Sequence, residues 1–320
     1  MLYLTHLSKM AAMHIPDGFL SLPVSLVFWG ISIVLIGIAV RKTRESFGER
    51  QAPLMGVMAA FIFAAQMINF PVAGGTSGHL LGGALAAIVL GPWAGMLVMT
   101  TVIFVQGLLF QDGGLLAMGA NIFNMGLLTA LIGFGVYRLH GIFGRQDQRV
   151  RWLFAGLAAW LSVVAGALST SLQLWLSGTS VLAVVLPAML GVHALIGAGE
   201  ALITSAALIF IFRTQPDLLK NEVSGASERR WMIGGVLASL GVLLLSPLAS
   251  AYPDGLERVA SNLGFINRSA EAPFLLLPDY TIPFLGETPF STIAAGLAGT
   301  IAVAALIFLA VRLIGRPRRA

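Results

Sequence analysis

Long runs of apolar residues, separated by short polar stretches, recur from one end of the chain to the other. A helix that crosses a membrane needs about 20 mostly apolar residues, within a range of roughly 17 to 25. A shorter run, Leu80–Leu90, follows the glycine-rich stretch 74–78; it either crosses only part of the bilayer or is helped across by its flanks. The pattern predicts an all-α, polytopic membrane protein with about nine transmembrane helices, the long ones being Leu20–Val40, Pro53–Phe70, Trp93–Phe110, Met118–Tyr137, Trp152–Leu176, Val181–Phe212, Trp231–Ala249 and Ser291–Ile314.

Lysine and arginine gather in four clusters, after the first, fifth, seventh and ninth runs. These residues accumulate in cytoplasmic loops. Nine crossings place all four clusters on one side, whereas omitting Leu80–Leu90 would place the first two clusters on opposite sides. We therefore expect the N-terminus outside and the C-terminus in the cytoplasm, with the clusters formed by Arg41, Lys42, Arg44 and Arg50, by Arg138, Arg145, Arg149 and Arg151, by Arg213, Lys220, Arg229 and Arg230, and by Arg312, Arg316, Arg318 and Arg319.

The runs divide the chain into two membrane units. Seven of them form a unit over residues 13–212, a basic polar linker covers 213–230, and two more runs in 231–320 flank an external segment, 252–290, rich in Pro, Gly and acidic residues. Residues 1–12 are too short for the three regions of a secretory signal. We interpret them as a leader or as sequence preceding a true start at Met13.

Composition supports the membrane class and excludes several activities. Hydrophobic residues make up 57% of the 320 residues and charged residues 10%, whereas soluble domains carry about 25% charged residues. The absence of cysteine excludes disulfides, thiolate metal sites and cysteine nucleophiles. The sequence contains no nucleotide-binding glycine loop and no His-Glu-x-x-His motif, so we expect no ATPase, no metalloprotease and no other enzyme. The net charge of +5 has a membrane explanation, and we expect no nucleic-acid partner.

Three of the five histidines lie where they could act together. His14 precedes the first run, His79 begins the third, and His193 lies inside the seventh, two helical turns before Glu200 on the same face. Ionisable groups inside a membrane helix line a pathway or form a buried hydrogen-bonded pair, and either interpretation fits His193 and Glu200.

Amide side chains accompany these histidines at the predicted outer ends of the runs. Gln66 and Asn69 end the second run, and Asn121 and Asn124 begin the fifth. Imidazoles and amides without cysteine suit a divalent transition metal of borderline softness. A structural role in tying the helices together is the alternative.

The Met13-His14 pair has a specific chemical meaning if Met13 is the first residue. Its amine, the next backbone nitrogen and the His14 imidazole would form a chelate of fused rings, and a second imidazole would complete four nitrogen donors. Four nitrogens in a plane favour Ni²⁺ or Cu²⁺. Within a longer leader, Met13 and His14 would be ordinary interfacial residues.

These motifs resemble the CbiM/NikM family, the substrate-binding S components of energy-coupling-factor (ECF) transporters for cobalt and nickel. The resemblance covers roughly residues 13–212. It is carried by Met13–Leu20 (Met-His-Ile-Pro-Asp-Gly-Phe-Leu), Asn69–Gly83 (which contains Gly-Gly-Thr-Ser-Gly-His), Gln111–Gly114, Gly119–Asn124, His193–Gly197 and Glu200–Ala201.

The C-terminal part is similar to the PDGLE type of accessory N component. Ser250–Glu257 contains Pro-Asp-Gly-Leu-Glu, and Asp279–Tyr280 through Leu285–Gly286 fits the rest of the external segment. The resemblance therefore implies a seven-helix S component fused to a two-helix accessory unit.

The resemblance also implies a ligand set, carried over residue by residue. The metal would be held by the Met13 amine, by the backbone nitrogen and imidazole of His14, and by the His79 imidazole. This set requires that residues 1–12 be absent from the mature protein. Candidates that line the pocket or orient a ligand are Asn69, Asn121, Asn124, His193 and Glu200.

By this resemblance we expect a multi-pass protein of the cell (inner) membrane that captures Ni²⁺ or Co²⁺ outside. A transmembrane T component and two ATPase subunits would then drive release inward, with no cofactor. The residues do not separate nickel from cobalt, although a four-nitrogen plane favours nickel, and we expect the two-helix tail to gate loading. The alternatives are an ion-coupled secondary transporter, with His193 and Glu200 as a proton relay, and a metal sensor or scaffold.

Overall fold

We describe a computed structural model that places residues 14–45, 51–144, 147–214 and 225–315. Within these ranges, seven helices are long and apolar enough to cross a membrane, and α2 (Gln51–Gln66) is a shorter apolar helix. Helices dominate because a backbone in hydrocarbon must satisfy its polar groups within its own segment. The long spans are α1 (Leu22–Glu45), α4 (Pro92–Val105) with η1 (Gln106–Phe110), α5 (Met118–Asn121) with η2 (Ile122–Leu128), α6 (Thr129–Arg138) and α7 (His140–Phe143), α8 (Gln148–Leu176), α9 (Leu182–Thr214), α10 (Gly225–Leu245) with η4 (Ser246–Leu248), and α12 (Pro289–Gly315).

The run Leu80–Leu90, which we predicted as the short ninth span, is helical only in α3 (Gly83–Leu90). Eight residues of helix extend about 12 Å, against about 30 Å of hydrocarbon. The residues before α3 lie outside the helix, and side chains satisfy their backbone: Gln66 donates to the Leu81 carbonyl, and Glu200 accepts from the Leu81 and Gly82 amides. The run is therefore helical over only part of the bilayer thickness, as expected for a run this short.

The short helix still reverses the chain direction. Gly83 lies against Thr129, and Ala84 lies against Gly133. Helix α3 thus runs alongside α6, toward the end marked by Arg138. The chain direction therefore still alternates from one membrane segment to the next, as a topology of nine segments requires.

A small β-hairpin occupies the glycine-rich stretch, where the sequence predicted no strand. Strands β1 (Phe70–Val72) and β2 (Thr76–Gly78) pair antiparallel, with Pro71 opposite Ser77. Gly74 and Gly75 turn the chain with φ of 89° and 72°, a conformation that glycine adopts without steric cost. Buried strand β2 leads directly into His79.

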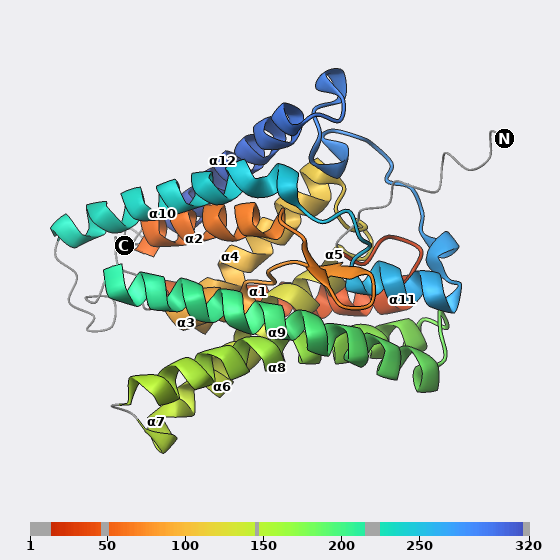
Figure 1. Cartoon of the computed structure of the whole chain (residues 1–320), viewed down its shortest axis with the longest axis horizontal. Coiled ribbons are helices and arrows are strands. Elements are labelled where there is room, and N and C mark those ends of the chain that lie inside the picture. The colour runs from red at the N-terminus through yellow and green to blue at the C-terminus, as the bar shows by residue number, and fades with distance from the viewer. Residues whose placement is uncertain (1–13, 46–50, 145–146, 215–224, 316–320) are drawn as a thin grey trace, which may run out of the picture.

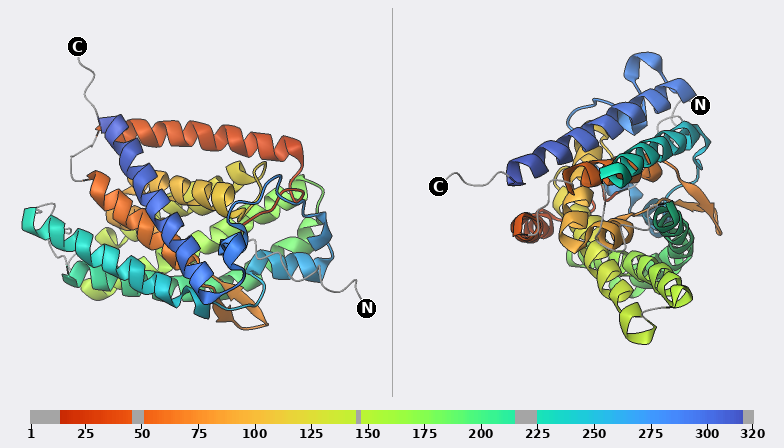
Figure 2. Two further views of the ribbon diagram at one scale, coloured as in Figure 1. Left: turned by 90° about the horizontal axis from the view of Figure 1, so that it is seen from above. Right: turned by 90° about the vertical axis from the view of Figure 1, so that its left-hand side faces the viewer.

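Two units of the chain pack into one bundle (Figures 1 and 2). Helices α10 and α12, from the C-terminal unit, pack against α2, while α8 packs against α9 and α6. The short helix α11 (Gly255–Leu263) and the turns η5 (Ile266–Arg268), η6 (Pro278–Tyr280) and η7 (Pro283–Leu285) lie between α10 and α12 in the chain. The larger apolar core fills the bundle, and a second one joins Ile15, Phe19 and Leu20 to Leu256 and Phe265.

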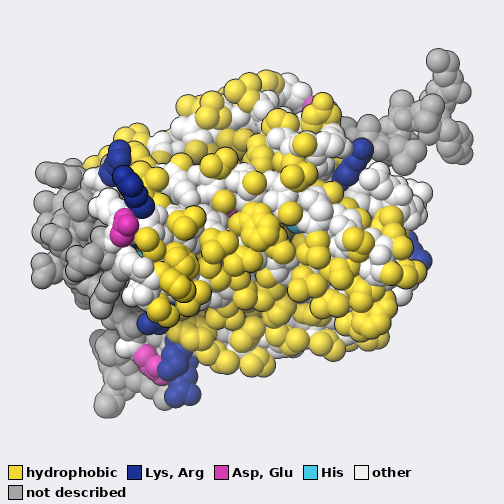
Figure 3. Space-filling model, turned by 60° about the horizontal axis from the view of Figure 1, so that its bottom comes forward, with side chains coloured by type: hydrophobic (Ala, Val, Ile, Leu, Met, Phe, Trp, Pro, Cys, Tyr) yellow, Lys and Arg dark blue, Asp and Glu magenta, His cyan; other side chains and the backbone are white. Residues whose placement is uncertain are grey.

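The surface agrees with immersion in a membrane. Figure 3 shows apolar side chains across the middle of one face, with lysine and arginine toward its two ends. The helix ends that carry the described members of the four basic clusters gather at one end of the bundle, opposite α11 (Figures 1 and 2). These members are Arg41, Lys42, Arg44, Arg138, Arg149, Arg151, Arg213, Arg229, Arg230 and Arg312; Arg50, Arg145, Lys220, Arg316, Arg318 and Arg319 lie outside the described residues.

Candidate metal centre

The segment that begins at His14 is held inside the protein by backbone contacts. The Asn121 side chain accepts from the Ile15 amide at 2.9 Å and donates to the Ile15 carbonyl at 3.0 Å. The Gly114 amide also donates to that carbonyl, at 2.9 Å. Two residues on, Asp17 Oδ1 accepts from the Ala117 amide at 2.9 Å. These bonds fix the position of His14 beside the C-terminal end of η1 and the N-terminal end of α5.

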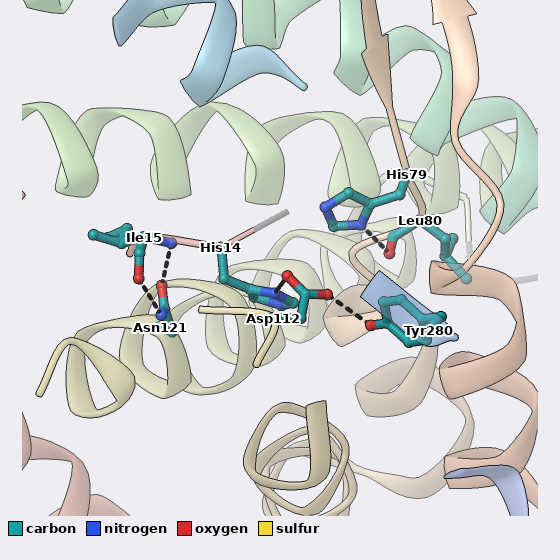
Figure 4. A network of polar contacts seen from close by, with 7 residues as sticks. All are labelled: His14, Ile15, His79, Leu80, Asp112, Asn121 and Tyr280. Carbon is teal, nitrogen blue, oxygen red and sulfur yellow. Dashed lines mark hydrogen bonds and ion pairs between the residues drawn. The ribbon is translucent and has the colours of Figure 1, made fainter. Parts of the chain in front are cut away.

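His14 takes part in a chain of hydrogen bonds that sequence reasoning did not identify (Figure 4). Its Nδ1 lies 2.7 Å from Asp112 Oδ1, and the Tyr280 hydroxyl donates to Asp112 Oδ2 at 2.6 Å. Burial raises the pKa of the Asp112 carboxyl, but the His14 imidazole and the Tyr280 hydroxyl bring it below its ordinary value. An ionised Asp112 accepts from both groups, so Nδ1 is the nitrogen of His14 that carries the proton.

A glycine lets Asp112 and His14 approach this closely. Gly113 has a φ of 100°, and a Cβ atom there would lie 2.8 Å from His14 Cβ. Any larger residue would push the histidine out of the site. The Gln-Asp-Gly-Gly motif therefore supplies both the carboxylate and the space beside it.

His79 lies next to His14 at the end of the hairpin (Figure 4). Its ring centroid is 6.1 Å from that of His14, and its Nδ1 lies 3.0 Å from the Leu80 carbonyl, a bond that assigns the proton to Nδ1. Only 6% of His79 is exposed. The bonds from Gln66 and Glu200 to the following residues hold this loop against α2 and α9.

A cavity of about 80 Å³ lies between the two histidines and helices α8 and α9. Pockets for organic ligands measure roughly 300–1,000 Å³, so this space suits an ion. Its polar lining consists of His14, Ser77, His79, Asn121, Asn124, Thr170, His193 and Asp254.

Two of the other predicted site residues, Asn124 and His193, also line the cavity. Asn124 lines the cavity, and its side chain binds Thr170, Ser169 and Gln173 of α8. His193 lines it too, with Nδ1 bound to the Met189 carbonyl of the same helix at 2.8 Å.

Two predicted candidates lie behind the cavity wall. Glu200 is fully buried and accepts from the Leu81 and Gly82 amides at 2.7 and 3.1 Å. The Asn69 carbonyl accepts from the Ser250 amide at 2.8 Å, and Asn69 is not among the residues that line the cavity. Glu200 therefore supports the loop that carries His79, whereas the backbone of Asn69 contacts the C-terminal unit.

The PDGLE motif covers the cavity. The Pro253 carbonyl accepts from the Ser77 amide at 2.8 Å, and the Tyr252 carbonyl accepts from the Ser77 hydroxyl at 2.8 Å. Asp254 and Glu257 form a capping box: Asp254 Oδ1 accepts from the Glu257 amide, and Glu257 Oε2 accepts from the Asp254 amide. This reciprocal pair starts helix α11 at the cavity.

The glycine of the motif permits contact with His193. A Cβ atom on Gly255 would lie 2.8 Å from both His193 Cε1 and Ile196 Cδ1. Both acidic residues of the motif have altered acidity: burial raises the pKa of Asp254 to about 6, and burial together with the nearby Asp254 raises the pKa of Glu257 to about 8. The motif thus closes the site with carboxyl groups that hold protons more strongly than usual.

Three imidazoles line the cavity, those of His14, His79 and His193, but the described side chains are not arranged as a complete ligand set for a metal. No group of three His, Asp or Glu side chains within the described ranges is arranged to hold an ion. Met13, the third predicted ligand residue, lies outside those ranges. Asp112 and Tyr280, which sequence reasoning missed, both belong to motifs that carried the resemblance, and that was their only sequence signal.

Two family descriptions match the chain. Residues 14–218 match CbiM, described as the cobalt uptake substrate-specific transmembrane region, and residues 228–316 match the PDGLE domain. The chain belongs to the CbiM family. It carries a CbiM unit and a PDGLE unit in one polypeptide, which confirms the predicted fusion.

Individual relatives of this CbiM family member have the same two-unit length. The putative fused nickel transport protein NikMN of Archaeoglobus fulgidus is 37% identical over 306 residues, which cover 94% of this chain and 98% of that one. The fused nickel transport protein NikMN of Rhodobacter capsulatus is 29% identical over 346 residues, covering 96% and 100%. A crystal structure of a truncated transition metal transporter, 33% identical, matches with a TM-score of 0.56 over 62% of this chain and 98% of that one.

Members of the family are metal transport proteins and not enzymes. The predicted class of all-α, polytopic membrane protein and the predicted role in nickel or cobalt transport are therefore confirmed. The membrane-crossing helices and the family together make this a multi-pass membrane protein.

Proposed function

We propose that the protein is the substrate-binding component of an ECF-type importer, with nickel favoured over cobalt. The observation that carries the proposal is the pair of buried imidazoles, His14 and His79, at a small cavity under the PDGLE motif. The Nε2 atom of His14 is buried and has no hydrogen-bond partner among the residues that the structure describes. An unsatisfied buried acceptor costs free energy, and a bound metal would remove that cost.

The preference for nickel rests on donor chemistry. His14 and His79 supply imidazole nitrogens, and we propose that Met13 supplies an amine nitrogen next to them, once residues 1–12 are absent. Nitrogen-rich sets favour Ni²⁺ and Cu²⁺ over harder ions. The names of the fused relatives, which specify nickel transport, support the same choice.

Transport by this chain would need partners. The sequence offers no nucleotide-binding loop, so energy would come from two separate ATPase subunits, coupled through a transmembrane T component. The metal cavity would face the outside, because the basic helix ends lie at the opposite end of the bundle and such residues favour the cytoplasm. The ion would be captured outside and released inward, with the PDGLE unit controlling access.

The contacts give little support to the rival proposal, in which His193 and Glu200 form a proton relay. His193 Nδ1 is bound to the Met189 carbonyl, and both Glu200 oxygens accept backbone amides. Glu200 thus has a structural task that explains its position in the membrane. A relay would also predict uptake by this chain alone, abolished by an uncoupler and indifferent to ATP.

The first test is the metal content of the purified protein in two forms, one beginning at Met13 and one retaining residues 1–12. Both are exposed to equal nickel and cobalt and measured by elemental analysis. Stoichiometric nickel only in the shorter form would support the amine as a ligand. Equal metal in both forms would assign the site to His14 and His79 without Met13, and no metal in either would contradict the proposal.

A second test separates the transport mechanisms. Vesicles containing this chain with its T and ATPase partners should take up nickel only with ATP, whereas vesicles with the chain alone should not. Removing residues 213–320 should reduce loading if the tail gates access. Uptake that survives this deletion unchanged would remove that role.

A further inference from the structure

A second cavity lies between the CbiM unit and the PDGLE unit, among helices α2, α9 and α10, and measures about 290 Å³. Helix α10 packs against α2, and Gly235 permits this close approach, because a Cβ atom there would lie 2.1 Å from Val57 Cγ1. Its neighbour Gly234 lines the cavity, and a Cβ atom there would meet nothing within 4 Å. Helix α10 is thus tight against α2 and leaves open space beside α9.

This second cavity is apolar and reaches the surface of the bundle. Among its described lining side chains, the indole of Trp231 carries the single hydrogen-bonding group. Phe210 of α9, which also lines the cavity, is 56% exposed and belongs to a helix apolar enough to cross a membrane. The space equals about ten water molecules at about 30 Å³ each, yet a buried water needs roughly 2–4 polar partners. A hydrocarbon chain from the surrounding membrane suits this lining better than water does.

Trp231 lacks the partner that its burial calls for. The residue is 7% exposed, and its Nε1 atom is buried without a hydrogen-bond acceptor among the residues that the structure describes. A buried N–H that has lost its water and gained no acceptor costs free energy. Trp231 is also the first residue of the apolar span in α10, the level at which tryptophan meets the polar groups of lipids. The cavity therefore suits a molecule that joins an apolar chain to a hydrogen-bond acceptor.

Arginines flank the end of the cavity at which Trp231 lies. Arg229 and Arg230 directly precede it in α10. Arg213 is the last residue of the apolar span in α9, and these two helix ends lie at the same end of the bundle (Figure 1). One carboxylate, that of Glu228, belongs to the same end of α10, so the described residues there are net positive. Basic pockets between transmembrane helices bind the head groups of anionic lipids.

We infer that this cavity is a binding site for an anionic phospholipid, taken from the membrane leaflet that meets the basic end of the bundle. One acyl chain fills the space between α9 and α10, and an oxygen at the polar end of the lipid accepts from the indole N–H of Trp231. The lipid thereby joins the PDGLE unit to the CbiM unit at the end where protein contacts leave a gap. This site is separate from the metal cavity and does not depend on the proposed metal.

The test uses the full chain in phosphatidylcholine vesicles that contain a varied fraction of lipid brominated on its acyl chains, either phosphatidylglycerol or phosphatidylcholine. Bromine quenches the fluorescence of a tryptophan that it contacts. The chain has six tryptophans, so every form is measured with and without Trp231→Phe, and the difference is the emission of Trp231. Gly234→Leu fills the cavity. Gly241→Leu is the matched control in the same helix, because a Cβ atom there also meets nothing within 4 Å and Gly241 does not line the cavity.

We expect half-quenching of Trp231 at a roughly 5-fold lower fraction of brominated phosphatidylglycerol than of brominated phosphatidylcholine, the effect of about one arginine near the phosphate. Gly234→Leu should abolish this preference and Gly241→Leu should keep it. Ala238→Leu, one turn along α10 in the same lining, gives the answer if Gly234→Leu does not fold. Equal quenching by the two lipids, or a preference that persists in the filled cavity, would overturn the inference. Absence of quenching by either lipid would also overturn it and would assign the cavity to a protein partner or to no occupant.

Discussion

The side chain of Asn121 holds the backbone of Ile15 by two hydrogen bonds, accepting at 2.9 Å and donating at 3.0 Å. The Asn121 side chain thus makes the two hydrogen bonds that a neighbouring β-strand would otherwise make with the backbone of Ile15, the residue after His14. The position of the candidate ligand therefore depends on a residue more than a hundred positions away in sequence.

Replacing Asn121 by alanine should loosen His14 without removing any metal ligand. The Ile15 amide would stay buried without an acceptor, at a cost of about 1–3 kcal/mol, which corresponds to a roughly 5- to 150-fold loss of nickel affinity if the whole cost falls on the bound state. Equilibrium dialysis measures this loss. The exposed Asn262 of α11 provides the control, Asn262→Ala, and equal affinities in the two variants would contradict the anchoring role.

Glu200→Gln should destabilise the loop that carries His79. Both carboxylate oxygens accept backbone amides, whereas glutamine would present an NH₂ group to one of these donors. The loss of one charge-assisted bond costs about 1.5–3 kcal/mol, so the midpoint of thermal unfolding should fall. Glu45→Gln, in an exposed side chain at the end of α1, should leave the midpoint unchanged. A relay role would instead leave stability intact and abolish proton-coupled uptake.

Gly255→Val should lift helix α11 from the cavity. A side chain at this position meets His193 and Ile196 at 2.8 Å from its Cβ atom alone, and valine adds two more carbons. We expect faster exchange of bound nickel with free nickel, measured with radioactive ⁶³Ni. Gly241→Val is the control in the same unit, because a Cβ there meets nothing within 4 Å. Similar exchange rates in both variants would show that α11 does not cover the site.

The packing of helix α11 against the cavity should weaken as the pH rises. Burial raises the pKa of Asp254 to about 6, and burial with the neighbouring carboxyl raises that of Glu257 to about 8, from ordinary values of about 4. The folded form thus binds protons more strongly than the undocked form, so this stability is complete below about pH 4 and is lost as the pH rises to about 8.

Hydrogen exchange in residues 255–263, corrected for the intrinsic rate, should therefore be slower at pH 5 than at pH 8. A variant with Asp254→Asn and Glu257→Gln should lose most of this dependence. Nickel affinity should show the opposite trend, because amine and imidazole donors must lose protons to bind. Faster exchange at pH 5 than at pH 8 would contradict the assigned acidity.

The sequence predicted the membrane class and most of the helices, because runs of about 20 apolar residues are typical of transmembrane helices. It did not predict the end of the short span. Leu81 and Gly82 are apolar residues like those of a helix, yet they lie outside the helix, where Gln66 and Glu200 bind their backbone. Such side-chain substitutes for helical hydrogen bonds depend on tertiary contact and leave no periodic pattern.

The site was predicted only in part for a similar reason. His14 and His79 stood out as rare titratable residues beside apolar runs, and motif resemblance paired them. Asp112 and Tyr280 lie 98 and 266 positions from His14, and no spacing rule relates them. Their chain of hydrogen bonds requires the PDGLE unit to be folded against the first unit, which is information that a single sequence does not contain.

The PDGLE unit reaches the cavity as part of the same polypeptide, which has a kinetic and a stoichiometric consequence. A tethered module meets its target at an effective concentration of roughly millimolar when the linker can span the distance. Closing the cavity again after it has opened is then a unimolecular step, and its rate does not depend on how many copies of the protein the cell makes. Each metal-binding unit is synthesised with one cover of its own, so a cell that varies its expression level cannot produce an uncovered excess.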